Sequence, residues 1–440
     1  MEQRFALTKP QRLIYDSEKY AGGSINVICG SVLVPGTKDD ITLKRMVNRL
    51  FKHNEAARLR IMEENGIPLQ EATEYTPQDI QILEFSSKES LDRYGNRLAK
   101  QPVDMYGALC QIHAVRLPDR YGILIHAHHL IGDAWTVAVI SNQVVAYAED
   151  FPIDVYPYRE YYETEQRYLQ DKRYSQGQDF FAGRYERCEP VFLSEKNEIA
   201  FEAKRVDITI AGREAQQIRD YLKENKFSSP AFFLTVFAEC LNRSMRNVDQ
   251  FYIGFTVGNR RMGRERKIWG NFVNTIPLLV SLNGEKSFSE NLNAVHSEVY
   301  ASLRHQRFHY EDVKQMLRER YGFTGNLYDV LFSYQNASLS VEAETTWYHN
   351  GMQLESLQFH VDDRDNDGIY RLHIDYQTEK FQEEEINAFV RRIQVLVKEI
   401  LHNADCPMRK LEWMSQEEKQ LVLESFSQGP KVYIDSLHSE

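Results

Sequence analysis

The stretch His128-His129-Leu130-Ile131-Gly132-Asp133-Ala134-Trp135 places two adjacent histidines and an aspartate at a turn. The apolar run before it, residues 121–128, is typical of a buried strand. Gly132 is expected to end that strand, and an apolar segment from Trp135 to Ile140 begins the next element. A histidine at the end of a buried strand, beside a turn, is well placed to exchange a proton with a substrate.

The two histidines are expected to have different roles. Neighbouring side chains alternate between the faces of an ideal strand, so His128 and His129 should point in opposite directions. One should therefore be structural and one functional. A metal site would instead use His126 and His128, which share a face, with Asp133 as third ligand. No second cluster of donors supports that alternative, so we expect no metal. A purely structural histidine pair is the other alternative.

Asp133 stands among apolar residues and is expected to be paired. A buried carboxylate without a cation costs several kcal/mol, so an arginine partner should be present. The segment Asn54-Glu55-Ala56-Ala57-Arg58-Leu59-Arg60 offers the candidates. We therefore interpret Asp133 as a residue that holds its loop and does not react.

Length, charge and cysteine content narrow the class of protein. The 440 residues exceed one ordinary core, which favours two lobes. A net charge of -11 with a pI near 5.7 argues against a general binder of nucleic acid or of anionic membrane surfaces. No signal peptide and no membrane-spanning apolar run is evident. The five cysteines are scattered and never spaced as CxxC, which indicates free thiols, no structural zinc and a cytoplasmic location.

The pattern of strand-like and helix-like segments predicts an α/β fold with an N-terminal lobe at residues 1–172 and a C-terminal lobe at residues 173–410. Residues 158–185 are expected to be helical and to bridge the lobes. We predict helices at 41–53, 229–241, 383–401 and 415–426, and strands at 251–255, 275–280, 328–334 and 369–376. Residues 427–440 have the composition of a linker.

A local basic run follows Gly258-Asn259 and contains Arg260, Arg261, Arg264, Arg266 and Lys267. We interpret it mainly as a solvated loop. The alternative is contact with a phosphate-bearing arm. There is no Gly-x-Ser-x-Gly elbow and no glycine-rich phosphate loop, so serine-hydrolase and nucleotide-dependent chemistry lack support.

An ordered set of motifs resembles the condensation domains of nonribosomal peptide synthetases. The histidine pair matches the His-His-x-x-x-Asp-Gly motif of that family, which is commonly followed by tryptophan. Other matching segments, in the expected order, are Leu7-Thr8-Lys9-Pro10-Gln11-Arg12-Leu13-Ile14-Tyr15, His53-Asn54-Glu55-Ala56-Ala57-Arg58, Trp269-Gly270-Asn271-Phe272-Val273-Asn274-Thr275 and His305-Gln306-Arg307-Phe308-His309-Tyr310-Glu311. The resemblance covers essentially the whole chain.

The resemblance implies two chloramphenicol-acetyltransferase-like lobes that form a V-shaped pseudo-dimer with a central tunnel. Peptidyl carrier domains would present the substrates on 4′-phosphopantetheine arms, and the acyl donor could come from an acyl carrier protein or from coenzyme A. The acceptor amine would attack the donor thioester to form an amide, with no permanent cofactor and no metal.

The resemblance also assigns roles to residues. It makes His129 the catalytic residue, with support from His128. Asp133 paired with Arg58 would hold the loop, and Asn274 would lie near the site from the second lobe. Three residues would line the substrate tunnel, namely Gly132, Ala134 and Trp135.

Two departures and two further likenesses refine this expectation. Ala134 stands where the family has glycine, and its methyl group could narrow donor access. Asn54 replaces the usual histidine of its motif. A start at Met1, together with residues 15–20 and 333–336, resembles starter members that acylate the first amino acid of lipopeptide antibiotics. Residues 411–426 look like a linker into a downstream adenylation domain.

Several alternatives share parts of the pattern. An epimerisation domain would also carry a Glu-Gly-His-Gly-type motif, and a cyclisation domain would show Asp-x-x-x-x-Asp in place of the histidine pair. A non-catalytic domain that recruits carriers or tailoring enzymes is consistent with Ala134 but not with intact His129 and Asp133. A free-standing acyl-CoA acyltransferase does not explain the linker-like segment at 411–426.

Overall fold

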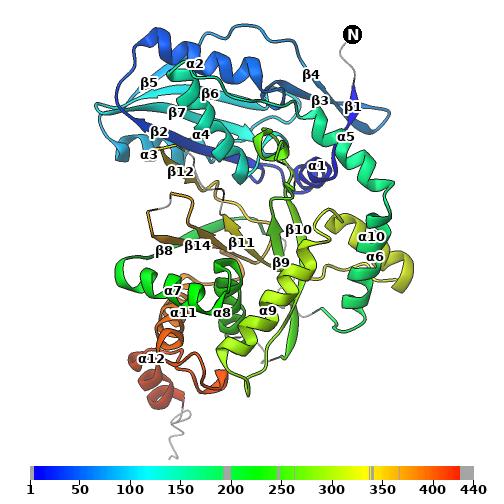
Figure 1. Ribbon diagram of the computed structural model, residues 1–440, viewed down its shortest axis with the longest axis vertical. Helices are drawn as coiled ribbons and strands as arrows, with labels where there is room; N and C mark the ends of the chain where they lie inside the picture. The colour runs from blue at the N-terminus through cyan, green and yellow to red at the C-terminus, as the bar shows by residue number, and fades with distance from the viewer. Residues whose placement is uncertain are drawn as a thin grey trace, which may run out of the picture.

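Two β-sheets with helices packed against them form two lobes, one above the other in Figure 1. The computed structural model describes residues 4–426 except 191, 193–199, 245–247, 262, 336, 338–340 and 366. The linker predicted at 427–440 and residue 336 of the starter-like segment therefore lie outside the described residues.

The N-terminal lobe is built on a five-stranded sheet, which surrounds the strand that precedes the histidine pair. Its order is β12 (Glu344–Tyr348), β2 (Val27–Pro35), β7 (Arg120–His128), β6 (Cys110–Arg116) and β5 (Ile82–Glu84). Strand β7 is central and almost entirely buried, as its continuous apolar sequence predicts. Helices α1 (Lys9–Ala21), α2 (Asp40–His53), α3 (Lys88–Leu98) and α4 (Ala134–Ala148) belong to this lobe, with a small sheet of β1 (Phe5–Ala6), β4 (Ile67–Ala72) and β3 (Leu59–Glu64).

The C-terminal lobe is built on a six-stranded mixed sheet. Its order is β10 (Asn274–Ser281), β9 (Gln250–Val257), β11 (Val330–Gln335), β13 (Leu357–Asp362), β14 (Tyr370–Gln377) and β8 (Ala203–Ile210). The strands predicted at 251–255, 275–280, 328–334 and 369–376 are all present, as β9, β10, β11 and β14. Its helices are α7 (Gly212–Asn225), α8 (Ser229–Ser244), α9 (Phe288–Leu303), α10 (Tyr310–Tyr321) and α11 (Glu383–Asn403), and α12 (Gln416–Leu421) follows them.

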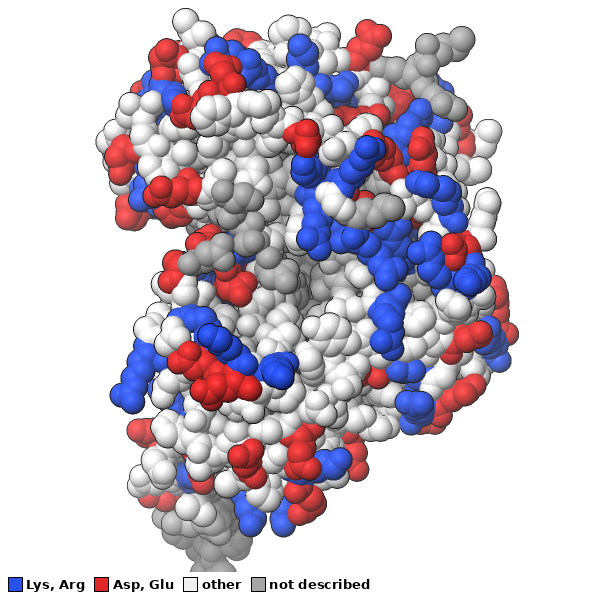
Figure 2. All heavy atoms as spheres, viewed as in Figure 1, with Lys and Arg blue, Asp and Glu red and all other residues white. Residues whose placement is uncertain are grey.

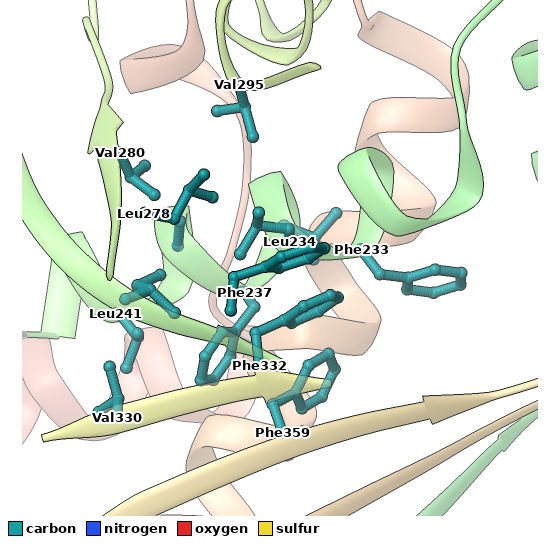
Figure 3. Packing of buried hydrophobic residues seen from close by; sticks show 14 of the residues in the cluster. Phe233, Leu234, Phe237, Leu241, Leu278, Val280, Val295, Val330, Phe332 and Phe359 are labelled. Carbon is teal, nitrogen blue, oxygen red and sulfur yellow. The ribbon is translucent and has the colours of Figure 1, made fainter. Parts of the chain in front are cut away.

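Helix α8 forms the centre of the C-terminal core. It begins at Ser229 with Pro230 in its first turn, where the missing N–H of proline is harmless. Its side chains are buried on every face over residues 231–242. Phe237 stacks on Phe359 of the sheet with ring centroids 4.6 Å apart, and Phe332 packs beside them (Figure 3). Such packing gives the lobe a rigid platform.

The two lobes are joined at two places. The segment predicted to be helical at 158–185 forms two helices, α5 (Arg159–Leu169) and α6 (Lys172–Tyr185), which run along one side of both lobes (Figure 1). In the other direction, β12 comes from the C-terminal half of the sequence and pairs with β2 of the N-terminal sheet. The lobes are therefore interlocked, and the N-terminal sheet is completed by residues beyond 172. No helix among the described residues is long and apolar enough to cross a membrane.

Candidate active site

The histidine pair lies where β7 ends. His128 is the last residue of the strand and pairs with Val27, whereas His129 begins a short 3-10 turn, His129–Ile131. The strand thus ends at His128 and not at Gly132, contrary to the sequence prediction. Gly132 has an extended backbone, and a Cβ there would lie 3.1 Å from the Cδ1 atom of Ile28. The change of backbone direction, and not strand alternation, separates the two imidazoles.

His129 keeps a free imidazole at the turn. Its backbone N–H donates to the Asn26 carbonyl over 2.7 Å, which fixes the main chain. Its Nδ1 atom is buried and has no hydrogen-bond partner in the described part of the chain. Burial lowers the pKa of His129 below its usual value, so the ring is neutral near pH 7. A neutral imidazole can accept a proton or a hydrogen bond from an amine.

His128 is held in place by its own turn and by α1. Its Nδ1 atom accepts a hydrogen bond from the Leu130 N–H, and its Nε2 atom lies 3.5 Å from a Glu18 carboxylate oxygen. Burial raises the pKa of Glu18, but the nearby His128 imidazole and the hydrogen bond that Asn26 donates outweigh burial, and the pKa is lowered overall. With both ring nitrogens facing protein groups, His128 supports the turn. His126 instead contacts the Gln101 carbonyl over 3.0 Å, and no group of metal ligands is found among the described residues.

Asp133 is the N-cap of α4 and is fully engaged. One carboxylate oxygen accepts from the N–H and hydroxyl of Thr136, at 3.0 and 3.2 Å. The other accepts from Arg260 at 2.6 Å and from the Phe272 N–H at 3.0 Å. Both charged side chains are almost completely buried. Asp133 therefore braces the turn, as predicted, and has no free oxygen for chemistry.

The partner of Asp133 is Arg260, and the expected pairing with Arg58 is wrong. Arg58 donates to the carbonyls of Phe51 and Thr73. It therefore stabilises the last turn of α2 and the residue that follows β4. Arg260 comes from the second lobe, through a segment at residues 258–272 that returns to the N-terminal lobe. The sequence prediction took the partner from the same predicted lobe as Asp133, and nothing in the sequence distinguishes Arg260 from its basic neighbours.

The first residues of the 258–272 segment therefore hold the two lobes together, and the segment is not simply a solvated loop. Arg260 also donates to the Gly270 carbonyl at 2.8 Å and lies over the Phe272 ring, 4.0 Å from its centroid. Gly270 is required by close approach, because a Cβ there would lie 2.2 Å from the Cδ2 atom of Tyr158. These contacts hold Asp133, and with it the start of α4, against a segment of the second lobe.

The remaining predicted residues lie around this framework. Asn274 donates to the carbonyls of Gln306 and Phe308 at 2.8 and 3.1 Å, and its oxygen accepts from the Tyr310 N–H at 3.3 Å. Its amide is thus occupied in holding the 306–310 turn.

Ala134 and Trp135 form the first turn of α4. Ala134 is the first residue of the helix and has no positive φ, so the backbone itself does not need glycine there. Trp135 donates from its indole N–H to the Arg266 carbonyl at 3.1 Å. This hydrogen bond is a second link between the start of α4 and the 258–272 segment, in addition to the Asp133–Arg260 pair. Asn54, which departs from the family motif, bonds the Gln143 side chain at 2.6 Å and so links α2 to α4.

Comparison with known proteins identifies the family. The model of the condensation domain matches residues 1–423. The chain belongs to the condensation domain family. It is 25% identical to surfactin synthase subunit 1 of Bacillus subtilis (strain 168), over 95% of this chain and 12% of that protein. It is also 25% identical to one subunit of plipastatin synthase from the same strain, over 98% of this chain and 18% of that protein. The chain thus spans less than a fifth of the length of these relatives.

Solved structures confirm the fold. A variant of the starter condensation domain of rhizomide synthetase, in complex with C8-CoA, has a TM-score of 0.83 and 18% identity, and the match covers 94% of this chain and 98% of that one. The first condensation domain of the calcium-dependent antibiotic synthetase, with a substrate analogue, has a TM-score of 0.81 and 15% identity, over 94% and 99% of the two chains. The predicted α/β architecture is thereby confirmed.

Proposed function

We propose that this domain joins a thioester-bound acyl donor to the amine of a carrier-bound aminoacyl acceptor, with His129 as the catalytic residue. The single observation that carries the proposal is the neutral, unpartnered imidazole of His129 beside a turn that the buried Asp133–Arg260 pair holds in place. An amine is a better nucleophile once deprotonated, and a neutral histidine can accept its proton or orient it.

The chain's residues divide the work between them. His129 positions the acceptor amine near the thioester carbonyl and takes up the proton that the amine loses as the amide bond forms. The thiol of the carrier or of coenzyme A leaves with a proton. His128 and Asp133 hold the turn, and Asn274 holds the neighbouring 306–310 turn. The substrate tunnel is lined in this proposal by Gly132, Ala134 and Trp135.

The proposed partners follow from the resemblance. The acceptor arrives on a peptidyl carrier domain, the donor on a carrier or on coenzyme A, and an adenylation domain follows residues 411–440. The starter type, with a fatty acyl donor, is the form we favour, because the rhizomide synthetase domain to which the chain is similar is a starter domain. The free thiols of all five cysteines suit a cytoplasmic protein.

Intact-protein mass spectrometry tests the proposal. The domain is mixed with an aminoacyl-loaded carrier and a panel of acyl-CoA, acyl-carrier and N-acetylcysteamine thioester donors. We expect the carrier to gain the mass of the acyl group with the wild-type domain and not with the His129→Ala variant. A carrier that binds but gains no mass with any donor would favour the non-catalytic recruitment domain. The next variant would then be Ala134→Gly.

A further inference from the structure

The side-chain amide of Gln11, in the first turn of α1, contacts the histidine turn. The side chain of Gln11 is completely buried, with an exposed fraction of 0%. Its Nε2 atom donates a hydrogen bond to the Leu130 carbonyl over 3.1 Å. Leu130 directly follows His129 and lies in the same 3-10 turn. The contact therefore joins α1 to the residue next to the proposed catalytic histidine.

The orientation of the Gln11 amide is fixed by Thr8. The Oε1 atom of Gln11 accepts from the Thr8 N–H at 3.0 Å and from the Thr8 hydroxyl at 3.1 Å. These contacts belong to the capping box that begins α1. Because donors hold the oxygen, the Nε2 atom has to face acceptors, and the Leu130 carbonyl is one of them. The amide therefore cannot flip without losing hydrogen bonds at both of its ends.

A second buried glutamine completes the hydrogen bonds of this amide. Gln70 of β4 accepts from the Nε2 atom of Gln11 at 2.8 Å and donates to its Oε1 atom at 2.7 Å. Gln70 also donates to the Ala6 carbonyl at 3.0 Å and is likewise completely buried. Among the described residues, none of its side-chain hydrogen bonds goes to the histidine turn. The two glutamines thus match in burial and in chemistry, and they differ in whether they contact the turn.

Helix α1 also holds the two histidines. Glu18 of this helix lies 3.5 Å from the Nε2 atom of His128. Asn26, whose carbonyl accepts from the His129 N–H, donates from its side chain to Glu18 at 2.8 Å. One helix therefore positions the whole turn, and Gln11 supplies the contact on the far side of His129.

The start of α1 is itself held by contacts to both lobes. The Lys9 ammonium group pairs with Asp312 of α10 at 2.7 Å. The Thr8 hydroxyl lies 2.9 Å from the Tyr158 hydroxyl, which donates to the Asn271 carbonyl at 3.0 Å. Asp312 and Asn271 come from the second half of the chain. The place of the first turn of α1 is thus set by the way the two lobes meet.

The Gln11 amide is not a group that a substrate contacts. Figure 2 shows the surface hollowed between the lobes, with lysine and arginine side chains gathered at one side of the hollow. A completely buried amide is no part of that surface, and both ends of the Gln11 amide are already bonded to protein groups. Any influence of Gln11 on the reaction therefore passes through the histidine turn.

We propose that Gln11 is a positioning residue, which fixes the direction of the His129 imidazole by holding the Leu130 carbonyl. The inference rests on the proposed role of His129 in amide formation. A reacting group displaced by about 1 Å can cost on the order of 100-fold in rate. Since the contacts of Asn26 and Asp133 with the turn remain when Gln11 is removed, we expect a smaller loss, of about tenfold.

A matched pair of variants tests the proposal. Gln11→Met and Gln70→Met each remove a buried amide and keep a side chain of similar length, so both should lower the urea midpoint by similar amounts. Gln11→Met should lower kcat about tenfold and leave the KM for the loaded acceptor within about twofold. Gln70→Met should keep kcat within about twofold, because Gln11 retains its contacts with Thr8 and Leu130. Equal losses of kcat in the two variants, or no loss in Gln11→Met, would overturn the inference.

A milder variant guards against misfolding. If Gln11→Met does not fold, Gln11→Asn takes its place, because the shorter side chain cannot bridge Thr8 and Leu130. The same comparison with Gln70→Met then applies, with the same expected loss of kcat.

Nuclear magnetic resonance of isotope-labelled histidines supplies a readout that needs no reaction. The His129 signal is identified by its absence in the His129→Ala variant. We expect Gln11→Met to move this signal and to raise the pKa of His129 toward its usual value, because burial lowers that pKa in the wild type. Gln70→Met should leave the signal in place. An unmoved His129 signal in Gln11→Met would contradict the positioning role.

The proposed function and this inference fail in different experiments. A His129→Ala variant that keeps its rate would contradict the proposed function, and the resonance experiment would still decide whether Gln11 orients the ring. In the His129→Ala background, Gln11→Met should cause no further loss of rate, because its effect passes through the imidazole. A further loss of about tenfold in that background would show that Gln11 acts by another route and would overturn the inference.

Discussion

Breaking the Asp133–Arg260 pair should strongly lower the free energy of unfolding of the protein. Both side chains are almost fully buried and lie 2.6 Å apart, so removing one leaves a buried charge alone. Loss of one partner of such a pair costs about 3–5 kcal/mol. We choose Arg260→Met, which keeps the packing on Phe272, and Asp133→Asn, which keeps a good helix N-cap. Each variant should lower the free energy of unfolding by about that amount.

A double-mutant cycle decides which arginine is the partner. Urea unfolding is followed by fluorescence for the single variants and for two double variants, Asp133→Asn with Arg260→Met and Asp133→Asn with Arg58→Met. The coupling between Asp133 and Arg260 should exceed about 2 kcal/mol, because neither has another ion-pair partner among the residues that the structure describes. The coupling between Asp133 and Arg58 should stay within about 0.5 kcal/mol, as expected for residues that share no contact. A larger coupling with Arg58 than with Arg260 would refute the assignment.

Three other outcomes follow from the geometry. Gly270→Ala would place a Cβ 2.2 Å from Tyr158 and should cost about 1–3 kcal/mol in urea unfolding, whereas Gly263→Ala, which meets open space, should be neutral. Burial raises the pKa of Glu165 to about 8, above the unfolded value, so the native state holds a proton that the unfolded state releases. Stability should therefore fall between about pH 5 and pH 8, by up to about 1.4 kcal/mol per pH unit, and Glu165→Gln should abolish that slope in pH-dependent melting. Because burial lowers the pKa of His129, the acid limb of the single-turnover rate should lie below about pH 6.5, and a midpoint above that value would contradict a buried neutral imidazole.

The sequence predicted most of the elements because their patterns are local. The buried strand before His128, the proline-started helix at Ser229 and the acid-first helix from Glu383 all appear where periodicity and capping place them. The capping of α4 by Asp133 likewise depends on neighbours a few residues away. Such short-range preferences depend on residues close in the sequence, so they can be predicted without the tertiary fold.

The errors came from contacts between distant segments. Arg260 reaches Asp133 across 127 residues, and no periodic pattern marks that pairing. The return of β12 to the N-terminal sheet spans more than 300 residues between Gly30 and Trp347. The 3-10 turn at His129 was missed because a continuous apolar run gives no sign of the residue at which the strand ends. Tertiary contacts, which a single sequence does not reveal, set all three.

The most direct test of the account is the single-turnover rate of amide formation with wild type and His129→Ala, each saturated with donor and loaded acceptor. We expect a loss of at least about 100-fold for the variant, as for removal of a positioned proton acceptor, with unchanged urea midpoint and acceptor affinity. A folded variant that keeps its rate to within about threefold would contradict the central role of His129.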